Sequence, residues 1–487
     1  MHHGKASQAR EFYGGEVISR KARILTFFFK TQSINFLIMD AYSVLKFGGT
    51  SVGSIENLHR IANILSGQTN TIVVVSALSG TTNKLVEMHT KLKQKEGKAC
   101  KDLLANEFER YQLFIDELFE NRLMASLVNE YIDQCFKELE GLVEQQYDHR
   151  FEKEILAYGE RMSSYIIHHF LNDLGIKNRL LNALDFMRIN EHKEPDLNKT
   201  TELLLAELYR HQEGGVFLTQ GFICRNVEDN IDNLNRGGSD YSATIIGHCA
   251  EASKIEIWTD INGLHNNDPR HVQNTYPIEY VTFEEAAELA YFGAKILHPL
   301  CIRPAKEKNI PVFLKNTLNP NDFGTMISNQ NGSGEPRIKA VASKDGIIAI
   351  KIKSGHMLQA YGFLTQVFSI FEKHKTPIDL ITTSEVAVSL TIDDTTFLEE
   401  IVEELHDLGE VEVDQNQSII CVVGQFVAEE AGIVNEVLQA LNRIPIRMIS
   451  YGGSKNNISL LVNEKDKVLC LRMLSQRLFQ NVQMVRR

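Results

Sequence analysis

The clearest pattern of hydrophobic and polar positions lies between residues 43 and 85. The apolar stretch "VLKF" predicts a short buried strand that ends at the glycine pair of "GGTSVGS". Next, "SIENLHRIANILS" has apolar residues at helical spacing behind Ser54, a typical N-cap, and "TIVVV" is a continuous apolar run. Such a run is typical of a strand covered on both faces, so the segment predicts a βαβ unit of a parallel sheet.

The alternation of strands and helices continues to about Thr325. Residues 97–150 are charged, with Leu and Ile three and four positions apart, which predicts a helical subdomain with a structural role. Further strands are predicted at "GVFLTQGFI" (215–223), "KIEIWTDINGL" (254–264) and "IPVFLKN" (310–316). The polar, Gly-rich segment "SNQNGSGEP" (328–336) then predicts a linker.

A repeat follows this linker. The segments "PIDLITTSEVAVSLTI" (377–392) and "PIRMISYGGSKNNISLLV" (445–462) begin and end alike, and an amphipathic helix precedes each. The repeat predicts two similar small α/β modules, at 337–413 and 414–487. The strand predicted at "IKAVASK" (338–344) could complete either module, so this boundary stays open.

Composition and charge narrow the class of protein. The 487 residues are 43% hydrophobic and 23% charged, as in ordinary globular proteins, and the formal net charge of −12 argues against a nucleic-acid partner. Seven scattered cysteines without C-x-x-C spacing indicate neither a disulfide framework nor a zinc site, and they favour a cytoplasmic location. No run of eighteen apolar residues exists, so no membrane contact is predicted.

Residues 1–38 form an N-terminal extension in which basic residues outnumber acidic ones, a composition that faintly resembles a transit peptide. Met39 stands directly before the first predicted strand. We therefore favour a disordered tail, or translation that begins at Met39, over an organelle signal.

The first candidate site is the glycine turn that follows Lys46. A lysine beside Gly48 and Gly49 suits an anion, because bare backbone amides can approach it, although the order reverses the usual P-loop. The carboxyl ends of parallel strands collect ligands, and there Lys46 would meet Ser76 and Thr82. Alone, the motif is equally compatible with a tight turn and a solvated lysine.

The stretch "LNRGGSDYSATIIG" (234–247) is the most informative one. Two glycines and Ser239 open a predicted helix whose N-terminus favours an anion; Arg236 can hold a carboxylate, and Asp240 can orient a lysine or a metal-bound phosphate. The alternative is a capped helix start with a solvated arginine.

Other acidic and basic residues complete the inventory. In "LAYGERMSS" (156–164), a glycine inside a helical pattern indicates close approach of another group, and the neighbouring Glu160 could bind an amine or pair on the surface with Arg161 or Lys153. "WTDINGLHNNDPR" (258–270) resembles a nucleotide-binding loop, and "FGAKILHP" (292–299) offers Lys295. Together these residues support phosphoryl transfer from a nucleotide to a small acid, which needs positioning and charge neutralisation.

Five of these segments, in this order, resemble the signatures of the aspartate kinases: "KFGGTSVGS", "LAYGERMSS", "LNRGGSDYSA", "IWTDINGLHNNDPR" and "FGAKILHP". The resemblance implies a three-layer α/β amino-acid kinase fold with a mainly parallel central sheet at 42–327, followed by two ferredoxin-like ACT modules. It also implies ATP- and magnesium-dependent phosphorylation of L-aspartate to 4-phospho-L-aspartate, the first step of lysine, threonine, methionine and diaminopimelate biosynthesis. Since the sequence ends after the second module, we expect a monofunctional kinase.

The resemblance also assigns roles by position. Catalysis falls to Lys46 and Asp240. Nucleotide contacts fall to Lys46, Phe47, Gly48, Gly49, Thr259, Asp260, His265, Arg270 and Lys295, and aspartate contacts to Ser76, Thr82, Glu160, Arg236 and Ser239. His265, Asn266 and Asn267 replace the family's usual tyrosine and two threonines, which leaves the contact to the base open.

Regulation is the last expectation. The segments "GHMLQAYGFL" (355–364) and "TPIDLITTSE" (376–385) resemble effector sites of lysine-sensitive relatives, which implies that L-lysine binds and inhibits through Met357, Ala360, Phe363, Leu364 and Asp379. Ala360 replaces a frequent serine, so threonine stays an alternative effector, as does a module that only forms dimers. ACT modules imply a homodimer or homotetramer. Two alternatives compete with this function: the chain is another amino-acid kinase, or it is an inactive amino-acid sensor.

Overall fold

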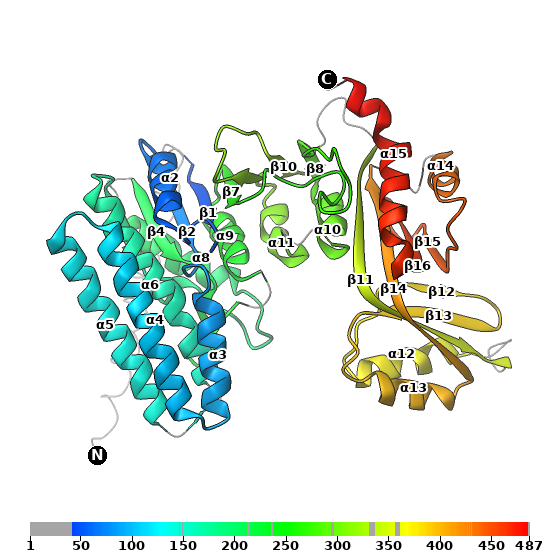
Figure 1. Ribbon diagram of the computed structural model, residues 1–487, viewed down its shortest axis with the longest axis horizontal. Helices are drawn as coiled ribbons and strands as arrows, with labels where there is room; N and C mark the ends of the chain where they lie inside the picture. The colour runs from blue at the N-terminus through cyan, green and yellow to red at the C-terminus, as the bar shows by residue number, and fades with distance from the viewer. Residues whose placement is uncertain are drawn as a thin grey trace, which may run out of the picture. The chain divides into compact units, whose positions relative to one another are not determined.

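The computed structural model describes residues 41–485, except residues 146, 149, 212–214, 235–236, 294–296, 331–336, 356–360, 426, 428 and 430. The part of the chain before residue 329 contains an eight-stranded sheet in the order β3-β4-β2-β1-β7-β9-β10-β8 (Figure 1). Its strands are β1 (Ser43–Phe47), β2 (Thr71–Val75), β3 (Asn178–Leu181), β4 (Val216–Gln220), β7 (Lys254–Thr259), β8 (Tyr280–Thr282), β9 (Val312–Asn316) and β10 (Thr325–Ser328). Every neighbouring pair is parallel except β9 and β10, which confirms the mainly parallel sheet.

Helices cover this sheet, and β1, β2 and β4 are therefore buried at every position. The helices are α2 (Ile55–Leu65), α3 (Thr81–Lys93), α4 (Gly97–Leu118), α5 (Arg122–Glu144), α6 (Phe151–Asp173), α7 (Ala183–Phe186), α8 (Leu197–Tyr209), α9 (Gly238–Cys249), α10 (Phe283–Tyr291) and α11 (Pro299–Glu307). The Ser54 side chain accepts a hydrogen bond from the Asn57 amide and so caps α2 as predicted.

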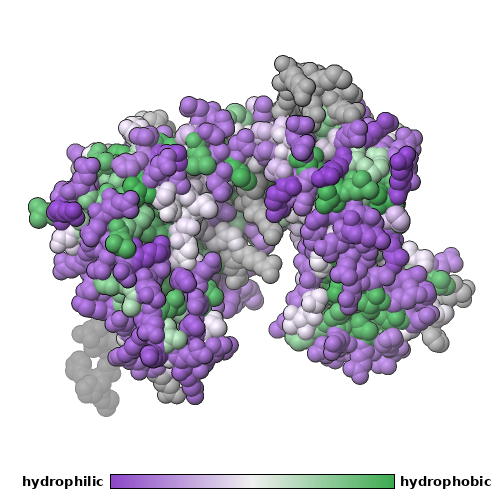
Figure 2. Space-filling view, in the orientation of Figure 1, coloured by the Kyte–Doolittle hydropathy of each residue, from purple (hydrophilic) through white to green (hydrophobic). Residues whose placement is uncertain are grey.

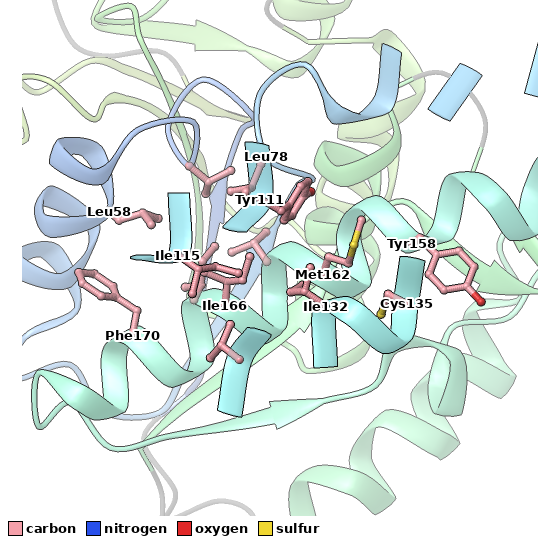
Figure 3. Packing of buried hydrophobic residues seen from close by; sticks show 14 of the residues in the cluster. Leu58, Leu78, Tyr111, Ile115, Ile132, Cys135, Tyr158, Met162, Ile166 and Phe170 are labelled. Carbon is pink, nitrogen blue, oxygen red and sulfur yellow. The ribbon is translucent and has the colours of Figure 1, made fainter. Parts of the chain in front are cut away.

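One core of the described residues lies between the sheet and α2 to α6. Residues such as Leu58, Tyr111, Ile132 and Met162 pack there in one cluster with side chains of β1, β2 and β4 (Figure 3). The charged segment 97–150 therefore forms helices, as its spacing predicts, and contributes its apolar face to this core.

One predicted strand is interrupted. The segment "GVFLTQGFI" divides into β4 and β5 (Ile223–Arg225), and β5 leaves the large sheet to pair with β6 (Ile231–Asn233). The break falls at Phe222, whose φ of 66° is incompatible with a strand. Its amide donates instead to the Ser242 hydroxyl of α9, at 2.8 Å.

The part of the chain from residue 337 onwards contains a six-stranded antiparallel sheet in the order β12-β13-β11-β14-β16-β15. Its elements are β11 (Ile338–Lys353), α12 (Phe363–Lys373), β12 (Ile381–Thr383), β13 (Ala387–Ile392), α13 (Leu398–His406), β14 (Glu410–Gly424), α14 (Ile433–Ala440), β15 (Met448–Tyr451), β16 (Asn457–Asn463), the 3-10 helix η3 (Glu464–Asp466) and α15 (Lys467–Val485). The predicted repeat appears as two hairpins, β12–β13 and β15–β16.

Two separate cores divide this sheet. One packs α12 and α13 on β13 and on the half of β11 beyond Ile348, and the other packs α14 and α15 on β16 and the second half of β14. The first half of β11 pairs with the second half of β14 and contributes Ile338 and Val341 to the second core. The visible face of the molecule is mostly hydrophilic, with separate hydrophobic patches (Figure 2). None of the described helices is long and apolar enough for a membrane span.

Candidate active site

The centre of the site is an ion pair between Lys46 and Asp240. Lys46 lies in β1 and Asp240 in the first turn of α9, and Lys46 Nζ lies 2.6 Å from Asp240 Oδ1. Both side chains are largely buried, with exposed fractions of 10% and 16%. A Cβ on Gly48 would stand 3.3 Å from Lys46 Nζ, so the glycine leaves the ammonium group accessible. Sequence reasoning predicted this pair of residues, and the fold brings them together.

The start of α9 comes close to neighbouring segments because its first residues are glycines. Gly237 adopts φ of 84°, and a Cβ there would stand 2.1 Å from Cys301 Sγ. A Cβ on Gly238 would lie 2.6 Å from the Phe222 ring. Ser239 follows them and accepts a hydrogen bond from Ser76 Oγ at 3.0 Å. The helix N-terminus, which attracts anions, is thereby held at the ends of β1 and β2.

A cavity of about 400 Å³ opens beside this helix start. It is lined by Gly49, Thr50, Ser76, Ala77, Leu78, Ser79, Gly80, Thr82, Glu160, Phe222, Gly238 and Ser239. Four predicted aspartate-binding residues, Ser76, Thr82, Glu160 and Ser239, therefore share one cavity with the predicted phosphate-binding Gly49. Arg236 and Lys295 lie outside the described residues.

Glu160 is the most unusual group in this cavity. Its exposed fraction is 4%, which excludes the alternative of a surface ion pair. Oε1 accepts the Ala77 amide at 3.4 Å, whereas Oε2 is buried without a hydrogen-bond partner. Burial raises the pKa of Glu160 to about 8. A cationic ligand group is what such a carboxylate lacks.

The predicted close approach at Gly159 is confirmed. A Cβ there would stand 2.9 Å from Ala77 Cβ and 3.4 Å from a Leu85 methyl group, so α6 can lie against the turn after β2 only without a side chain at this position. This contact is what places Glu160, the next residue, beneath the cavity.

Sequence reasoning missed Phe222. Its positive φ is unusual for a bulky residue and marks a constrained position. The ring lines the cavity and packs against the backbone of Gly238. A signal was present in the sequence, because Gly221 directly precedes Phe222 inside an otherwise apolar strand pattern, and such a glycine indicates a bend or close approach.

The predicted nucleotide residues fall into two groups. Thr259 ends β7, the neighbour of β1, and Asp260 follows it; Thr259 Oγ1 donates to Asp260 Oδ1 at 3.0 Å. Lys315, at the neighbouring end of β9, lies 5.7 Å from the Trp258 ring centre, and burial lowers its pKa. Phe47 stacks on the same Trp258 ring, at 5.9 Å. Lys315 is a cation that sequence reasoning did not select.

His265 and Arg270 form the second group. His265 contacts Asn262 and Thr275, and burial lowers its pKa. Arg270 pairs with Asp268 at 2.7 Å and is largely exposed. Neither has a described contact with Lys46 or Asp240, so their nucleotide roles stay predictions.

Among the predicted effector residues, Phe363 is buried at the start of α12, after Gly362 with φ of 87°, and Leu364 is 38% exposed. Asp379 is almost fully buried, and its Oδ1 accepts from Lys344 Nζ at 2.7 Å and from the Tyr291 hydroxyl. The second oxygen, Oδ2, has no hydrogen-bond partner. Met357 and Ala360 lie outside the described residues.

Comparison with known proteins gives consistent relatives. Residues 42–316 match the amino acid kinase family and residues 420–478 an ACT domain. The chain is 33% identical to lysine-sensitive aspartokinase 3 of Escherichia coli, over 91% of this chain and 100% of that protein. Two crystal structures of E. coli aspartokinase III, each 32% identical, cover 90% of this chain and 100% of their own. The complex with aspartate and ADP has a TM-score of 0.77, and the complex with lysine and aspartate has 0.73.

Proposed function

Because the chain belongs to the aspartokinases of the amino acid kinase family, we propose that it transfers the γ-phosphoryl group of ATP to the side-chain carboxylate of L-aspartate. The observation that carries this proposal is the cavity that joins Glu160 to the start of α9. One end of the cavity offers a buried carboxylate without a cationic partner, and the other offers amides and hydroxyls beside the Lys46–Asp240 pair. A small zwitterion with a second carboxylate fits both ends.

In this arrangement Glu160 accepts the ammonium group of aspartate. Arg236 holds the α-carboxylate, and Ser76, Thr82 and Ser239 add hydrogen bonds from the cavity wall. The side-chain carboxylate then points towards Lys46. Position rather than covalent chemistry raises the rate, since the reacting oxygen is held in line with the phosphoryl group.

Lys46 has the main electrostatic role. Its ammonium group neutralises charge that develops on the transferring phosphoryl group, and Asp240 fixes its position. The amides of Gly48 and Gly49 approach the phosphates, with Phe47 and the Trp258 ring behind them. Thr259, Asp260, His265, Arg270 and Lys295 are assigned to the nucleotide.

In this proposal, a magnesium ion would bind together with the ATP phosphates. The cation prefers oxygen ligands and usually keeps several waters while it binds one or two carboxylates and the substrate phosphates. Asp240 supplies such a carboxylate at the helix start where the phosphates are placed. When bound, the cation would supply charge neutralisation at the phosphates, and Asp240 would help to hold it.

The activity is tested by an ATP-dependent assay with L-aspartate, L-glutamate and N-acetylglutamate in parallel. We expect turnover with L-aspartate, trapped as its hydroxamate. Turnover with only one of the other acids would identify the chain as a different amino-acid kinase. No turnover with any of the three acids would favour an amino-acid sensor.

We further propose that L-lysine inhibits the enzyme through the first ACT module. The Asp379 side chain is almost fully buried, Phe363 of α12 lies in the same small module, and Asp379 Oδ2 has no hydrogen-bond partner, so an ammonium group could pair with it. Met357, Ala360 and Leu364 complete the proposed site. Inhibition requires that lysine binds a low-activity arrangement better than the active one. Initial rates measured with lysine or with threonine, at sub-saturating aspartate and ATP, identify the effector. Rates that neither amino acid changes would show that neither acts as an effector of this module.

A homodimer or homotetramer through the ACT modules completes the proposal. Both edge strands of the six-stranded sheet, β12 and β15, carry exposed apolar residues, among them Ile381, Ile449 and Tyr451. Light scattering after size exclusion tests it, since a particle of the chain's own 55.2 kDa would contradict it.

A further inference from the structure

The buried hydroxyl of Thr81 lies at the centre of a polar network that the catalytic roles above do not use. Thr81 is the first residue of α3 and is fully buried. Three side chains of one turn of α4 surround its hydroxyl: Arg110 Nη2 at 2.7 Å, Tyr111 Oη at 3.0 Å and Glu107 Oε1 at 3.3 Å. The other carboxylate oxygen, Glu107 Oε2, accepts a hydrogen bond from Arg110 Nε at 3.0 Å.

These contacts satisfy the hydroxyl completely. A threonine hydroxyl has one hydrogen to donate and two lone pairs to accept. Arg110 can only donate and Glu107 can only accept as a carboxylate, which leaves the second lone pair for a hydrogen bond from Tyr111. Burial raises the pKa of Tyr111 well above its usual range, so this phenol keeps the proton that it donates. Thr81, Glu107 and Tyr111 are buried and the Arg110 side chain is partly exposed, and a satisfied network of this kind favours a single arrangement of its buried members.

The network meets the proposed aspartate cavity through the backbone of Thr81. Its neighbours on both sides, Gly80 and Thr82, line the cavity, whereas the Thr81 side chain lies on the side of α4. Gly80, with φ of 86°, is the N-cap residue directly before α3, so the turn changes direction at this point. Fixing Thr81 therefore fixes the backbone from which the Thr82 hydroxyl reaches the cavity.

The same network also lies close to Glu160. The Thr81 methyl group stands 3.6 Å from where a Cβ of Gly159 would be, and the charge of Glu160 contributes to the raised pKa of Tyr111. Tyr111 and Leu78, at the start of this turn, belong to one packed cluster (Figure 3). Thr81 thus connects α4 to two walls of the cavity, the turn that carries Thr82 and the helix that carries Glu160.

We propose that Glu107, Arg110 and Tyr111 are positioning residues for the acidic substrate, which they hold in register with the phosphoryl donor by fixing Thr81. This proposal rests on the proposed function, because the cavity is taken to bind L-aspartate. It assigns a role in substrate binding to the helical segment that the sequence pattern marks as structural. The positioning acts on the aspartate side of the site only, since within the described part of the chain these residues make no hydrogen bond or ion pair with Lys46 or Thr259.

The first experiment compares Thr81→Val, which keeps the shape and removes the hydroxyl, with Thr81→Ser, which keeps the hydroxyl. We expect Thr81→Val to raise the KM for L-aspartate by about ten-fold or more while the KM for ATP stays unchanged, and Thr81→Ser to stay near the wild type. Tyr111→Phe and Glu107→Gln should change the same KM in the same direction. Equal changes in both KM values, or none for L-aspartate, would overturn the proposal.

A matched control comes from the same helical layer. Lys101 of α4 and Glu144 of α5 form an exposed pair at 2.7 Å, away from the cavity lining. Glu144→Gln therefore removes a carboxylate partner as Glu107→Gln does, and both KM values should stay unchanged.

Hydrogen–deuterium exchange separates this proposal from the proposed function. In Thr81→Val the amides of residues 78–85 should exchange faster than in the wild type, while those of α5 should not. Unchanged exchange at 78–85 would contradict positioning by the network even if the kinase is active. If the wild type does not phosphorylate L-aspartate, the proposed function fails, and this exchange result still decides whether the network fixes the turn.

Discussion

At the scale of single residues, Lys46 and Glu160 have opposite electrostatic surroundings. Lys46 is a buried cation with a carboxylate 2.6 Å away, and Glu160 is a buried carboxylate without a cation. The proposed phosphate-binding cation is thus paired before any ligand binds, whereas Glu160, the proposed partner of an ammonium group, has no ion pair and its raised pKa favours the protonated form. In the proposed function, this asymmetry favours a zwitterionic substrate.

Lys46→Ala should lower kcat by about 10²–10³-fold, the usual cost of one electrostatic group that acts in the transition state. Removing Lys46 also leaves Asp240 buried without its partner, so the melting temperature must be measured beside the rate. Steady-state kinetics at saturating aspartate and ATP give kcat directly. A variant that folds and retains wild-type turnover would refute the role of this lysine.

Glu160→Gln tests the raised pKa through stability. The pKa of Glu160 rises from 4.5 to about 8 on folding, so the folded chain binds this proton more tightly than the unfolded chain. Ionised Glu160 therefore destabilises the fold, and this destabilisation increases as the pH rises from about 4.5 to about 8. Glu160→Gln has no such cost. Its melting temperature should match the wild type at pH 4.5 and exceed it at pH 9 by at least 2–4 °C, or about 1 kcal/mol. A constant difference between the two pH values would count against the shift.

The same pKa predicts the pH dependence of substrate binding. An ammonium group beside Glu160 favours the ionised carboxylate, so aspartate binding should release a proton below pH 8. The KM for L-aspartate should therefore fall as pH rises from 6 to 8 and then level off. Isothermal titration in buffers of different ionisation enthalpy counts the released proton, and zero release at pH 6.5 would disprove the assignment.

At the scale of elements, the site is made by close approach of helices to the turns that follow strands. Gly159 lets α6 reach Ala77, and Gly237 lets α9 reach Cys301. In α6 the glycine works against helix propensity, which favours alanine by about 1 kcal/mol. Packing decides here, because the adjoining group is a methyl on a fixed backbone and cannot move aside.

Gly159→Ala should therefore lower the melting temperature and raise the KM for L-aspartate, because α6 must shift and Glu160 shifts with it. The double variant with Ala77→Gly removes the opposing methyl group and should restore both values in part. Differential scanning fluorimetry and steady-state kinetics measure the two effects. Improved stability in Gly159→Ala alone would show that the contact is not tight.

The elements themselves could largely be predicted from the sequence, and their functional details only in part. Periodicity predicts the βαβ unit and the helices of residues 97–150, and the repeat predicts two similar α/β segments, since helices and strands follow local spacing. It predicts one strand where Phe222 breaks it, because a positive φ depends on Ser242 and Gly238 of another element. It also leaves the environment of Glu160 open, since burial is a property of tertiary packing rather than of neighbouring residues.

At the scale of the whole molecule, α10 connects the catalytic sheet to the regulatory one. Lys339 of β11 is completely buried and donates to Glu285 of α10 at 2.9 Å and to the Tyr280 carbonyl at 2.9 Å. Glu285 also closes the capping box at the start of α10. The helix that ends at Tyr291 is thereby fixed to β11 at its beginning, and its end reaches the proposed effector residue Asp379.

The last prediction concerns this contact between Tyr291 and Asp379. The Tyr291 hydroxyl donates to Asp379 Oδ1, which Lys344 also approaches, so a lysine ligand whose ammonium group binds Asp379 must share a carboxylate that already has two partners. Tyr291→Phe removes one competitor, and the lysine concentration for half-maximal inhibition should fall about three-fold or more, since hydrogen bonds to charged groups contribute about 1.5–3 kcal/mol. The kcat without lysine should not change. Tyr147→Phe is the matched control, because it loses a tyrosine hydroxyl that contacts His89 at 3.0 Å in the helical layer. Inhibition curves at fixed aspartate compare the three proteins, and an unchanged or higher half-maximal concentration in Tyr291→Phe would mean that lysine does not compete for Asp379.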